Sequence, residues 1–392
     1  MFEIIDKEDA LNDFETVIKV IGVGGAGGNA VDHMIREGVM GVEFVAANTD
    51  AQALKRSLAH KKLRLGKTGL GAGAKPEVGR DAAIGEREQI AGVLKGSHMV
   101  FITAGMGGGT GTGAAPVVAE IAREMGILTV AVVTKPFSFE GKRTKIAEAG
   151  IAELQKHVDS LIVILNERLM DVLGDDASME ECFKAADNVL RNAVGGIAEI
   201  INYPGLVNVD FEDVKTVMSE MGRAMMGSAS ASGVDRARLA AEQAVASPLL
   251  EGVNLSGAKG VLVNITSSRS LKMKEVNEVM NTVREFADED AHIIFGAVYE
   301  EGIEDELRVT VVATGLGQQQ TKRQPFEVIS TPVVQSMGTG TDGIFANGGN
   351  VDYGALDVPA VVRKGRNATV EALVNSGVDR YDIPAFLRKQ AD

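Results

Sequence analysis

Residues 105–113 read Gly105-Met106-Gly107-Gly108-Gly109-Thr110-Gly111-Thr112-Gly113, six glycines and two threonines in nine positions. Without Cβ atoms the backbone reaches positive φ and brings consecutive N–H groups onto one anion, and the threonine hydroxyls add further donors. The stretch follows the apolar run 99–102 and precedes the helix-like residues 114–121. We therefore expect a strand, a loop and a helix, with a phosphate bound at the helix N-terminus.

A second glycine cluster, residues 22–29, follows the strand-like residues 16–21 and precedes the helix-like residues 30–36. Its Gly22 and Gly24 begin a G-x-G-x-x-G match, and Glu43 stands at a spacing suited to a ribose contact, so a dinucleotide site is one interpretation. Two glycine loops far apart in the sequence favour another interpretation, in which one long phosphate chain is held from both sides.

Further motifs occur in a fixed order along the chain: Asn48-Thr49-Asp50, then residues 69–77, 208–213 and 382–389. With the GGGTGTG string, they resemble the tubulin/FtsZ family, and the bacterial division proteins more closely than the tubulins. The resemblance covers residues 15–316 and the C-terminal end. It implies a protein that binds and hydrolyses GTP.

The organisation of the chain is that of an α/β protein. From residue 16 to about 202, apolar strand candidates at 42–47, 63–65, 99–104, 127–133 and 161–165 alternate with helical segments, which predicts a doubly wound parallel sheet. Residues 179–201 repeat apolar side chains at helical spacing, and the resemblance makes this the central helix. The predicted parts are a flexible N-terminal arm (1–15), a GTP-binding domain (16–178), the central helix (179–202), a smaller mixed α/β GTPase-activating domain (203–316), a disordered linker (317–379) and a partner-binding C-terminal peptide (380–392).

Composition excludes several classes of function. A formal net charge of −14 argues against a nucleic-acid partner, because binding to a phosphate backbone needs clustered Lys and Arg. The single cysteine, Cys182, forms no intramolecular disulfide, fits a reducing compartment and is expected to be a buried helical thiol. The N-terminus is acidic where a signal peptide is basic, and the apolar stretch 127–134 is too short for a bilayer. We expect a cytoplasmic protein without direct membrane insertion.

Three residues are candidates for selecting the base. Asp187 is the informative one, because a carboxylate accepts from both the ring N–H and the exocyclic amine of guanine but repels the bare ring nitrogen of adenine. Phe183 lies four residues earlier on the same helix face and would stack on the purine, whereas Asn166 would hydrogen-bond its edge. The alternatives are a core Phe and a helix-capping Asn. In the family, the matching positions line the guanosine pocket.

The resemblance also implies that Glu140 and Arg143 hold the ribose and a nearby phosphate. The chain is one residue shorter than the family pattern around 142–145, so Lys142 or Lys145 is the alternative to Arg143, and about three family residues are missing near Gly66–Gly69. The complete set of predicted nucleotide-binding residues is Gly24, Gly25, Ala26, Gly27, Gly28, Asn29, Gly107, Gly108, Gly109, Thr110, Gly111, Thr112, Glu140, Arg143, Asn166, Phe183 and Asp187.

Hydrolysis needs a water positioned for attack on the γ-phosphate, and the glycine loops hold no carboxylate for that task. The best candidates are Asp210 and Asp213, three apart at a helix start, with Asn208 nearby; their alternative role is N-capping and helix-dipole complementation. This acidic segment follows the long helix and should lie at the opposite end of the first domain from the phosphate loops. A subunit of this kind would assemble head to tail into a filament.

The resemblance completes the hypothesis. It implies a GTPase that polymerises into the mid-cell division ring, with GTP or GDP and Mg²⁺ as cofactors, and with membrane-tethering division proteins such as FtsA and ZipA bound through residues 380–392. No dedicated protein metal site is predicted. Two other classes stay open: a dinucleotide-dependent oxidoreductase, and a nucleotide-binding regulator that does not polymerise.

Overall fold

The structure is a computed structural model that describes residues 16–316 except 175, 204, 208, 220–221, 248–257, 289, 301 and 304. The predicted N-terminal arm, linker and C-terminal peptide lie outside the described residues. All the described residues belong to one compact unit. No helix among them is long and apolar enough to cross a bilayer.

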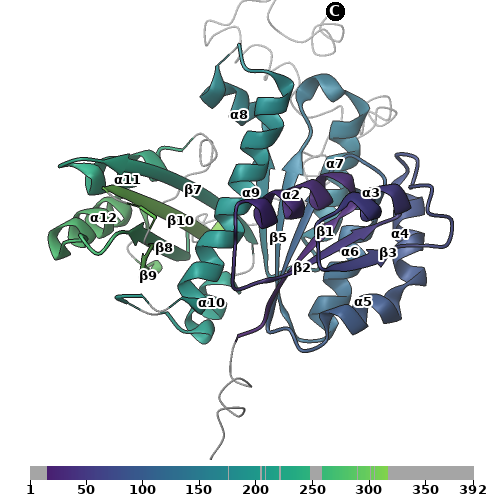
Figure 1. Cartoon of the computed structure of the whole chain (residues 1–392), viewed down its shortest axis with the longest axis horizontal. Helices are drawn as coiled ribbons and strands as arrows, with labels where there is room; N and C mark the ends of the chain where they lie inside the picture. Colours follow the sequence, from purple (N-terminus) through teal and green to yellow (C-terminus); the bar gives the residue numbers. More distant parts are fainter. Residues whose placement is uncertain are drawn as a thin grey trace, which may run out of the picture. The chain divides into compact units, whose positions relative to one another are not determined.

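One sheet runs through this unit, with the strand order β3-β2-β1-β4-β5-β6-β7-β10-β8-β9 (Figure 1). From β3 to β7 all neighbours are parallel, whereas β10 is antiparallel to both β7 and β8, and β8 is parallel to β9. The strands are β1 (Ile18–Val23), β2 (Glu43–Asn48), β3 (Lys61–Arg64), β4 (Met99–Gly105), β5 (Leu128–Lys135), β6 (Ser160–Leu165), β7 (Gly222–Ser232), β8 (Gly260–Ser267), β9 (His292–Tyr299) and β10 (Glu306–Leu316).

The connections place a topological switch point between β1 and β4. From β1 the chain adds β2 and β3 on one side and then returns to add β4 on the other. In open α/β sheets, ligands bind in the crevice that such a reversal leaves at the carboxyl ends of the strands. The two glycine clusters of the sequence follow these two strands.

Helices cover both faces of the sheet. Buried side chains of α2 and α9 pack on one face of the parallel part, and those of α4, α5, α6 and α7 pack on the other. In the second half, α11 and α12 pack against β8 and β10. The helices are α2 (Gly24–Arg36), α3 (Ala51–Arg56), α4 (Pro76–Gly85), α5 (Arg87–Leu94), α6 (Thr110–Glu124), α7 (Lys142–Leu154), α8 (Asn166–Leu173), α9 (Met179–Asn202), α10 (Phe211–Met218), α11 (Arg236–Val245) and α12 (Met273–Phe286), with the 3-10 turn η2 at Ser138–Glu140.

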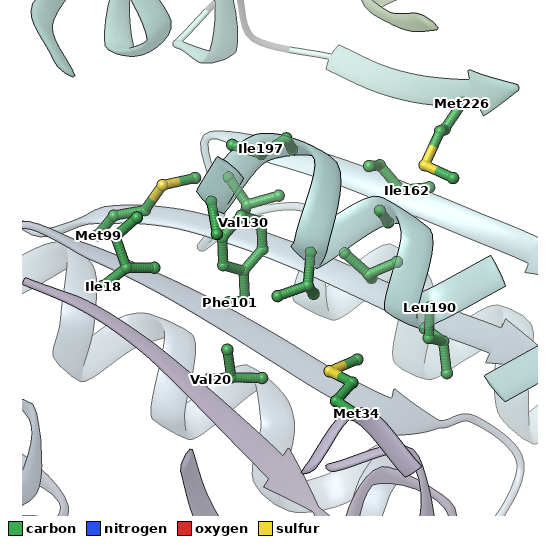
Figure 2. Close-up of a cluster of buried hydrophobic side chains, with 14 of the residues drawn as sticks. Ile18, Val20, Met34, Met99, Phe101, Val130, Ile162, Leu190, Ile197 and Met226 are labelled. Carbon is green, nitrogen blue, oxygen red and sulfur yellow. The ribbon is translucent and has the colours of Figure 1, made fainter. Parts of the chain in front are cut away.

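The long helix α9 joins the two halves. It begins at a capping box, in which Ser178 Oγ accepts from the Glu181 amide and Glu181 accepts from the Ser178 amide. Figure 2 shows Leu190 and Ile197 of this helix with Phe101 and Val130 of the first half and Met226 of the second. One continuous core therefore extends from β1 across to β7, and Cys182 is a buried residue of α9, as expected.

The predicted α/β fold is confirmed, with two local differences. The strand β7 reads GRAMMGSASAS, whose small residues lack the β-branched pattern that would have indicated a strand. The first glycine cluster was expected to be a loop, but α2 begins at Gly24 within it. It can do so because Gly27 packs against β4, where an added Cβ would lie 2.3 Å from the Thr103 carbonyl oxygen.

Candidate functional site

Two adjoining cavities open at the carboxyl ends of the parallel strands. The first, of about 420 Å³, lies between α2, the segment after β5, and helices α8 and α9. The second, of about 570 Å³, lies between α2, the end of β2 and α3. Both are lined by Gly25 and Asn29, so the N-terminal turns of α2 separate and connect them. Together the two cavities form one groove, in which each cavity could hold one end of an elongated ligand.

Most of the predicted nucleotide-binding residues line this groove. The first cavity contains Gly25, Ala26, Asn29, Glu140, Arg143, Asn166, Phe183 and Asp187. The second contains Gly24, Gly25, Gly28, Asn29 and Thr110. The other predicted residues line neither cavity, namely Gly27, Gly107, Gly108, Gly109, Gly111 and Thr112.

The glycines do two different jobs. An added Cβ at Gly25 or Gly28 would meet no heavy atom within 4 Å, so their bare backbone is open toward the groove. In contrast, a Cβ at Gly111 would lie 2.6 Å from the Gly105 carbonyl oxygen, and one at Gly109 would lie 2.8 Å from Ala72. The second glycine stretch is thus tightly packed at these two positions, whereas Gly108 is open like Gly25 and Gly28.

Thr112 has a structural place that the sequence did not indicate. Its hydroxyl accepts a hydrogen bond of 2.9 Å from the Gly107 amide. Gly107 has a φ of +96°, a conformation that favours glycine. Its side chain lines a separate cavity of about 480 Å³ between α4, α6 and α7. Thr112 therefore stabilises the backbone of the glycine stretch and does not face the groove.

The first cavity holds two polar groups suited to a ligand. Asn166 is only 5% exposed, and its assigned Oδ1 has no hydrogen-bond partner. Burial raises the pKa of Asp187 to about 6, against the opposing attraction of His33 and Arg36. Both features describe buried polar groups that a ligand donor would satisfy.

The alternative roles of these residues do not agree with the structure. Phe183 is 46% exposed on the cavity wall, although α9 buries its apolar neighbours, so it is not a core residue. Its ring meets that of Phe137 edge-on, 5.8 Å between centroids. Asn166 is the first residue of α8, and the N-cap is Leu165, so Asn166 caps nothing.

The turn η2 brings a charged pair to the same cavity. Glu140 Oε1 accepts 3.0 Å from the Phe137 amide, and its other oxygen pairs with Arg143. Arg143 also lies 3.5 Å from the Gly107 carbonyl oxygen through Nε. Arg143 lines the cavity, whereas Lys142 and Lys145 do not.

The second cavity is lined by residues of two family motifs, Asn48-Thr49-Asp50 and residues 69–77, which were not predicted to bind the nucleotide. Asn48 and Asp50 line it, as does Gly71, and Thr49 contacts Thr110 nearby. The signal was their place immediately after β2, since the carboxyl ends of adjacent parallel strands meet at one edge. The carboxylates here are engaged: Asp50 accepts from two amides of α3, and Asp32 accepts from Ser57 and Leu58.

This arrangement fits a cation that is held mainly by a ligand. Among the described residues, no group of three or more His, Cys, Asp or Glu side chains is placed to hold a metal ion. A Mg²⁺ ion keeps several waters and needs only one or two protein oxygens beside phosphate oxygens. Asn48 and Thr110 supply uncharged oxygens at this end of the groove.

The acidic segment lies at the other edge of the sheet. Asp210 caps α10 and accepts 2.8 Å from the Asp213 amide, and both carboxylates are exposed. At its start, α10 places the Phe211 ring 6.1 Å from that of His98, just before β4, and the Met218 carbonyl at its end accepts from Ser160 at the start of β6. The capping role is thus real, and the segment cannot reach the groove of its own chain. Asn208 lies outside the described residues.

The structure disfavours the dinucleotide interpretation. Glu43 is the first residue of β2, at the edge remote from the groove, where it pairs with Lys61 at 2.8 Å. Its hydrogen bond with Lys61 lowers the pKa of its carboxyl group. A ribose-binding carboxylate must stand at the opposite end of this strand.

Comparisons with known proteins agree with this geometry. The family model for the tubulin/FtsZ GTPase domain matches residues 17–174, and that for the FtsZ C-terminal domain matches residues 222–317. The cell division protein FtsZ of Pseudomonas aeruginosa is 55% identical over the full length of both chains, and that of Coxiella burnetii is 53% identical over 95% of this chain and 96% of its own.

Solved structures show the same relationship. An empty FtsZ dimer from M. jannaschii is 45% identical, with a TM-score of 0.75, and the match covers 81% of this chain and 93% of that one. The protofilament of CetZ2 from Haloferax volcanii with bound GTPγS has a TM-score of 0.65 at 21% identity, a likeness of fold alone. The chain belongs to the FtsZ family of tubulin-like proteins, the GTP-binding, filament-forming GTPases of cell division.

Proposed function

We propose that each GTPase site of the filament is completed by two subunits. The groove at the carboxyl ends of the parallel strands holds GTP, with guanine near Asp187 and Asn166 and the phosphates near Gly25 and Thr110. The exposed carboxylates of Asp210 and Asp213 come from the next subunit. The division of the chain into a nucleotide-binding part and an activating part, as predicted from the sequence, is part of this proposal.

The observation behind this proposal is the separation of the two sets of residues within one chain. Helix α9 has 24 residues and therefore spans about 36 Å. Phe183 and Asp187 near its start line the groove, while the acidic segment follows its end. Figure 1 accordingly has α8 at one end of α9 and α10 at the other.

Exposed apolar side chains support a head-to-tail contact. Leu70 is 89% exposed and Phe139 is 66% exposed, and both lie beside residues that line the groove. Leu206, close to the acidic segment, is 56% exposed. A head-to-tail contact would bury these side chains, and two different surfaces at opposite ends of a subunit give a heterologous contact that extends as a filament.

The chemistry assigned to the shared site is in-line attack of water on the γ-phosphate. The open amides of the α2 N-terminus and the Thr110 hydroxyl hold the phosphate oxygens and stabilise the charge that develops on them. The carboxylates of Asp210 and Asp213 accept hydrogen bonds from the attacking water and orient it. Bound Mg²⁺ would offset the charge of the triphosphate, and Asn208 remains a proposed neighbour of the water.

A mixing experiment tests the shared site. Asp213→Ala leaves the groove intact but supplies no acidic residue to its neighbour, whereas Asp187→Ala weakens the groove but keeps the acidic segment. We expect each variant alone to hydrolyse GTP slowly and an equimolar mixture to regain activity, because the groove of the first variant meets the acidic segment of the second. A mixture no faster than the average of its components would refute the proposal.

Protein concentration provides a second measurement. We expect GTP hydrolysis to begin above a threshold concentration, at which light scattering also appears, because no site exists before subunits meet. Hydrolysis proportional to concentration from zero, without scattering, would indicate the self-contained regulator considered from the sequence.

We also propose that residues 380–392 bind membrane-tethering division proteins and so bring the filaments to the division site. The apolar residues Ile383 and Phe386 beside Arg388 and Lys389 are typical of a short linear motif. Removal of this segment should leave polymerisation and hydrolysis in vitro unchanged and abolish localisation to the ring in cells. Normal localisation of the shortened chain would exclude this role.

A further inference from the structure

One contact at the rim of the groove joins two segments that the nucleotide-binding residues do not themselves connect. The Ser138 amide donates to Glu167 Oε2 and the Ser138 hydroxyl donates to Glu167 Oε1, both at 2.9 Å. Ser138 is the first residue of turn η2, and Glu167 is the second residue of α8. Both oxygens of one carboxylate are thus committed to a single residue of the turn.

The neighbours of these two residues are those assigned to the nucleoside. Glu167 directly follows Asn166, which lines the cavity and whose buried Oδ1 has no hydrogen-bond partner. Ser138 lies within the turn that ends at Glu140 and positions Arg143. Fixing the turn relative to α8 therefore fixes the two sides of the nucleoside end relative to each other.

The residues that flank the turn on either side contact the glycine stretch and α9. Arg143 approaches the Gly107 carbonyl, and Phe137 contacts the Phe183 ring edge-on. The turn reverses at Gly141, whose φ is +58°, a conformation that favours glycine. The turn and its flanking residues Phe137 and Arg143 therefore contact α9 and the glycine stretch, and the Ser138–Glu167 pair joins the turn to α8.

We propose that Glu167 is a positioning residue for the nucleoside: its carboxylate sets the spacing between the Asn166 side and the Glu140–Arg143 side of the pocket. This role rests on the proposed assignment of the groove as the GTP site. Glu167 does not itself line the cavity, so it acts through the residues that it holds.

A simpler role for Glu167 is favourable interaction with the dipole of α8, since it lies in the first turn of that helix. The two roles respond differently to substitution. Glu167→Gln loses the negative charge but keeps an oxygen to accept from the Ser138 amide and an amide group to donate to the Ser138 hydroxyl. Glu167→Ala loses both the charge and the bonds.

The test is the equilibrium dissociation constant of the full-length chain for GTP and GDP, measured below the polymerisation threshold. We expect Glu167→Ala to raise both constants about tenfold, because the loss of its two hydrogen bonds to Ser138 reaches the nucleotide only through the residues that they position, and Glu167→Gln to restore most of the affinity. The loss should be equal for GTP and GDP, because the nucleoside is common to both. At saturating GTP, turnover in the filament should stay within about twofold of the parent, since the acidic segment is untouched.

Two control variants separate the possible failures. Glu124→Ala removes an exposed glutamate that pairs with Arg87, far from the groove, and should not alter binding. Asp187→Ala tests the site: if it binds GTP normally, the groove assignment fails. If Asp187→Ala binds weakly while Glu167→Ala binds as the parent does, only the positioning role fails. Weak binding by both Glu167→Ala and Glu167→Gln would indicate the dipole effect and also overturn the proposal.

Discussion

The hydroxyl oxygens of Thr49 and Thr110 lie 2.6 Å apart. Thr49 follows β2 and is 4% exposed, and Thr110 begins α6 after β4. These strands are not neighbours, because β1 lies between them. The contact therefore bridges the β1 switch point and orients the Thr110 side chain, which lines the second cavity.

Replacement of Thr49 by valine should keep the volume and remove this bond. We expect GTP affinity to fall by about three- to tenfold, because one neutral hydrogen bond contributes about 1 kcal/mol and Thr110 loses its fixed rotamer. Thr49→Ser retains the hydroxyl and should bind as the parent does. Isothermal titration of both variants is the measurement, and equal affinities for the two would show that the bridge has no effect on the ligand.

The raised pKa of Asp187 predicts opposite pH dependences for stability and binding. Burial raises this pKa from 3.8 to about 6, so between these values the folded chain binds more protons than the unfolded chain. The contribution of Asp187 to the free energy of unfolding of the nucleotide-free protein therefore decreases as pH rises through that window. We expect a decrease of about 1 kcal/mol after allowance for partial solvent screening. Guanine needs the carboxylate, so GTP affinity should increase as pH rises through about 6.

Asp187→Asn provides the check on this assignment. It should remove the affinity change near pH 6 and weaken GTP binding at pH 7, because the amide presents a donor to the guanine amine. Xanthosine triphosphate, with a carbonyl oxygen in place of that amine, should bind the variant better than GTP does. A variant that still prefers GTP would place the base elsewhere.

The packing of the first glycine cluster predicts a large cost for one methyl group. A Cβ at Gly27 would lie 2.3 Å from the Thr103 carbonyl oxygen, so Gly27→Ala must push α2 away from β4. We expect a loss of about 2–3 kcal/mol in the free energy of unfolding, from overpacking in a tight core. Gly92→Ala in α5 meets nothing within 4 Å and should instead be neutral or stabilise by up to about 1 kcal/mol. Urea unfolding distinguishes the two.

Arg236 forms a buried polar cluster in the second half of the chain. It is 3% exposed and bonds to Glu275 at 2.7 Å, to the Asp305 carbonyl at 3.1 Å and to Ser270 at 3.0 Å. The hydrogen bond from Arg236 lowers the pKa of the Glu275 carboxyl group. Three segments, at 236, 268–275 and 305, therefore meet on one guanidinium.

We expect Arg236→Ala to destabilise the chain by about 3 kcal/mol, because it leaves the largely buried Glu275 carboxylate without its cation. Arg238→Ala, which removes an exposed pair with Glu242, should leave the midpoint of thermal unfolding close to that of the parent. Thermal unfolding of both variants, compared with the parent, measures the difference. Similar small changes in the unfolding temperature of both variants would mean that water readily hydrates the Glu275 carboxylate once Arg236 is removed.

Much of the fold followed from local sequence. The apolar runs of β1, β4 and β5, the helical periodicity of α9 and the glycine stretch after β4 each predict their own element, because backbone propensity and side-chain period act over a few residues. The strand β7 did not follow, because its glycines, alanines and serines have no strand preference. It is a strand because β10 pairs with it over most of its length.

The site divides in the same way. The sequence suggested Asp187, Phe183 and Asn166 as one set from their chemistry, and all three line the same cavity. The sequence could not separate glycines open to the groove, such as Gly25 and Gly28, from those packed on backbone, such as Gly111.

The sequence by itself determined the types of element, their order and the chemical groups available for GTP. Only the tertiary structure decided which groups meet: Thr49 with Thr110, Glu167 with Ser138, and Thr112 with the back of the glycine stretch. The placement of Asp210 and Asp213 beyond the far end of α9 was expected from the sequence, because the length of a helix follows from its apolar period. The physical reason for the difference is that parallel strands bring segments that are distant in the sequence to one edge of the sheet, and no local pattern specifies which of these segments will be neighbours.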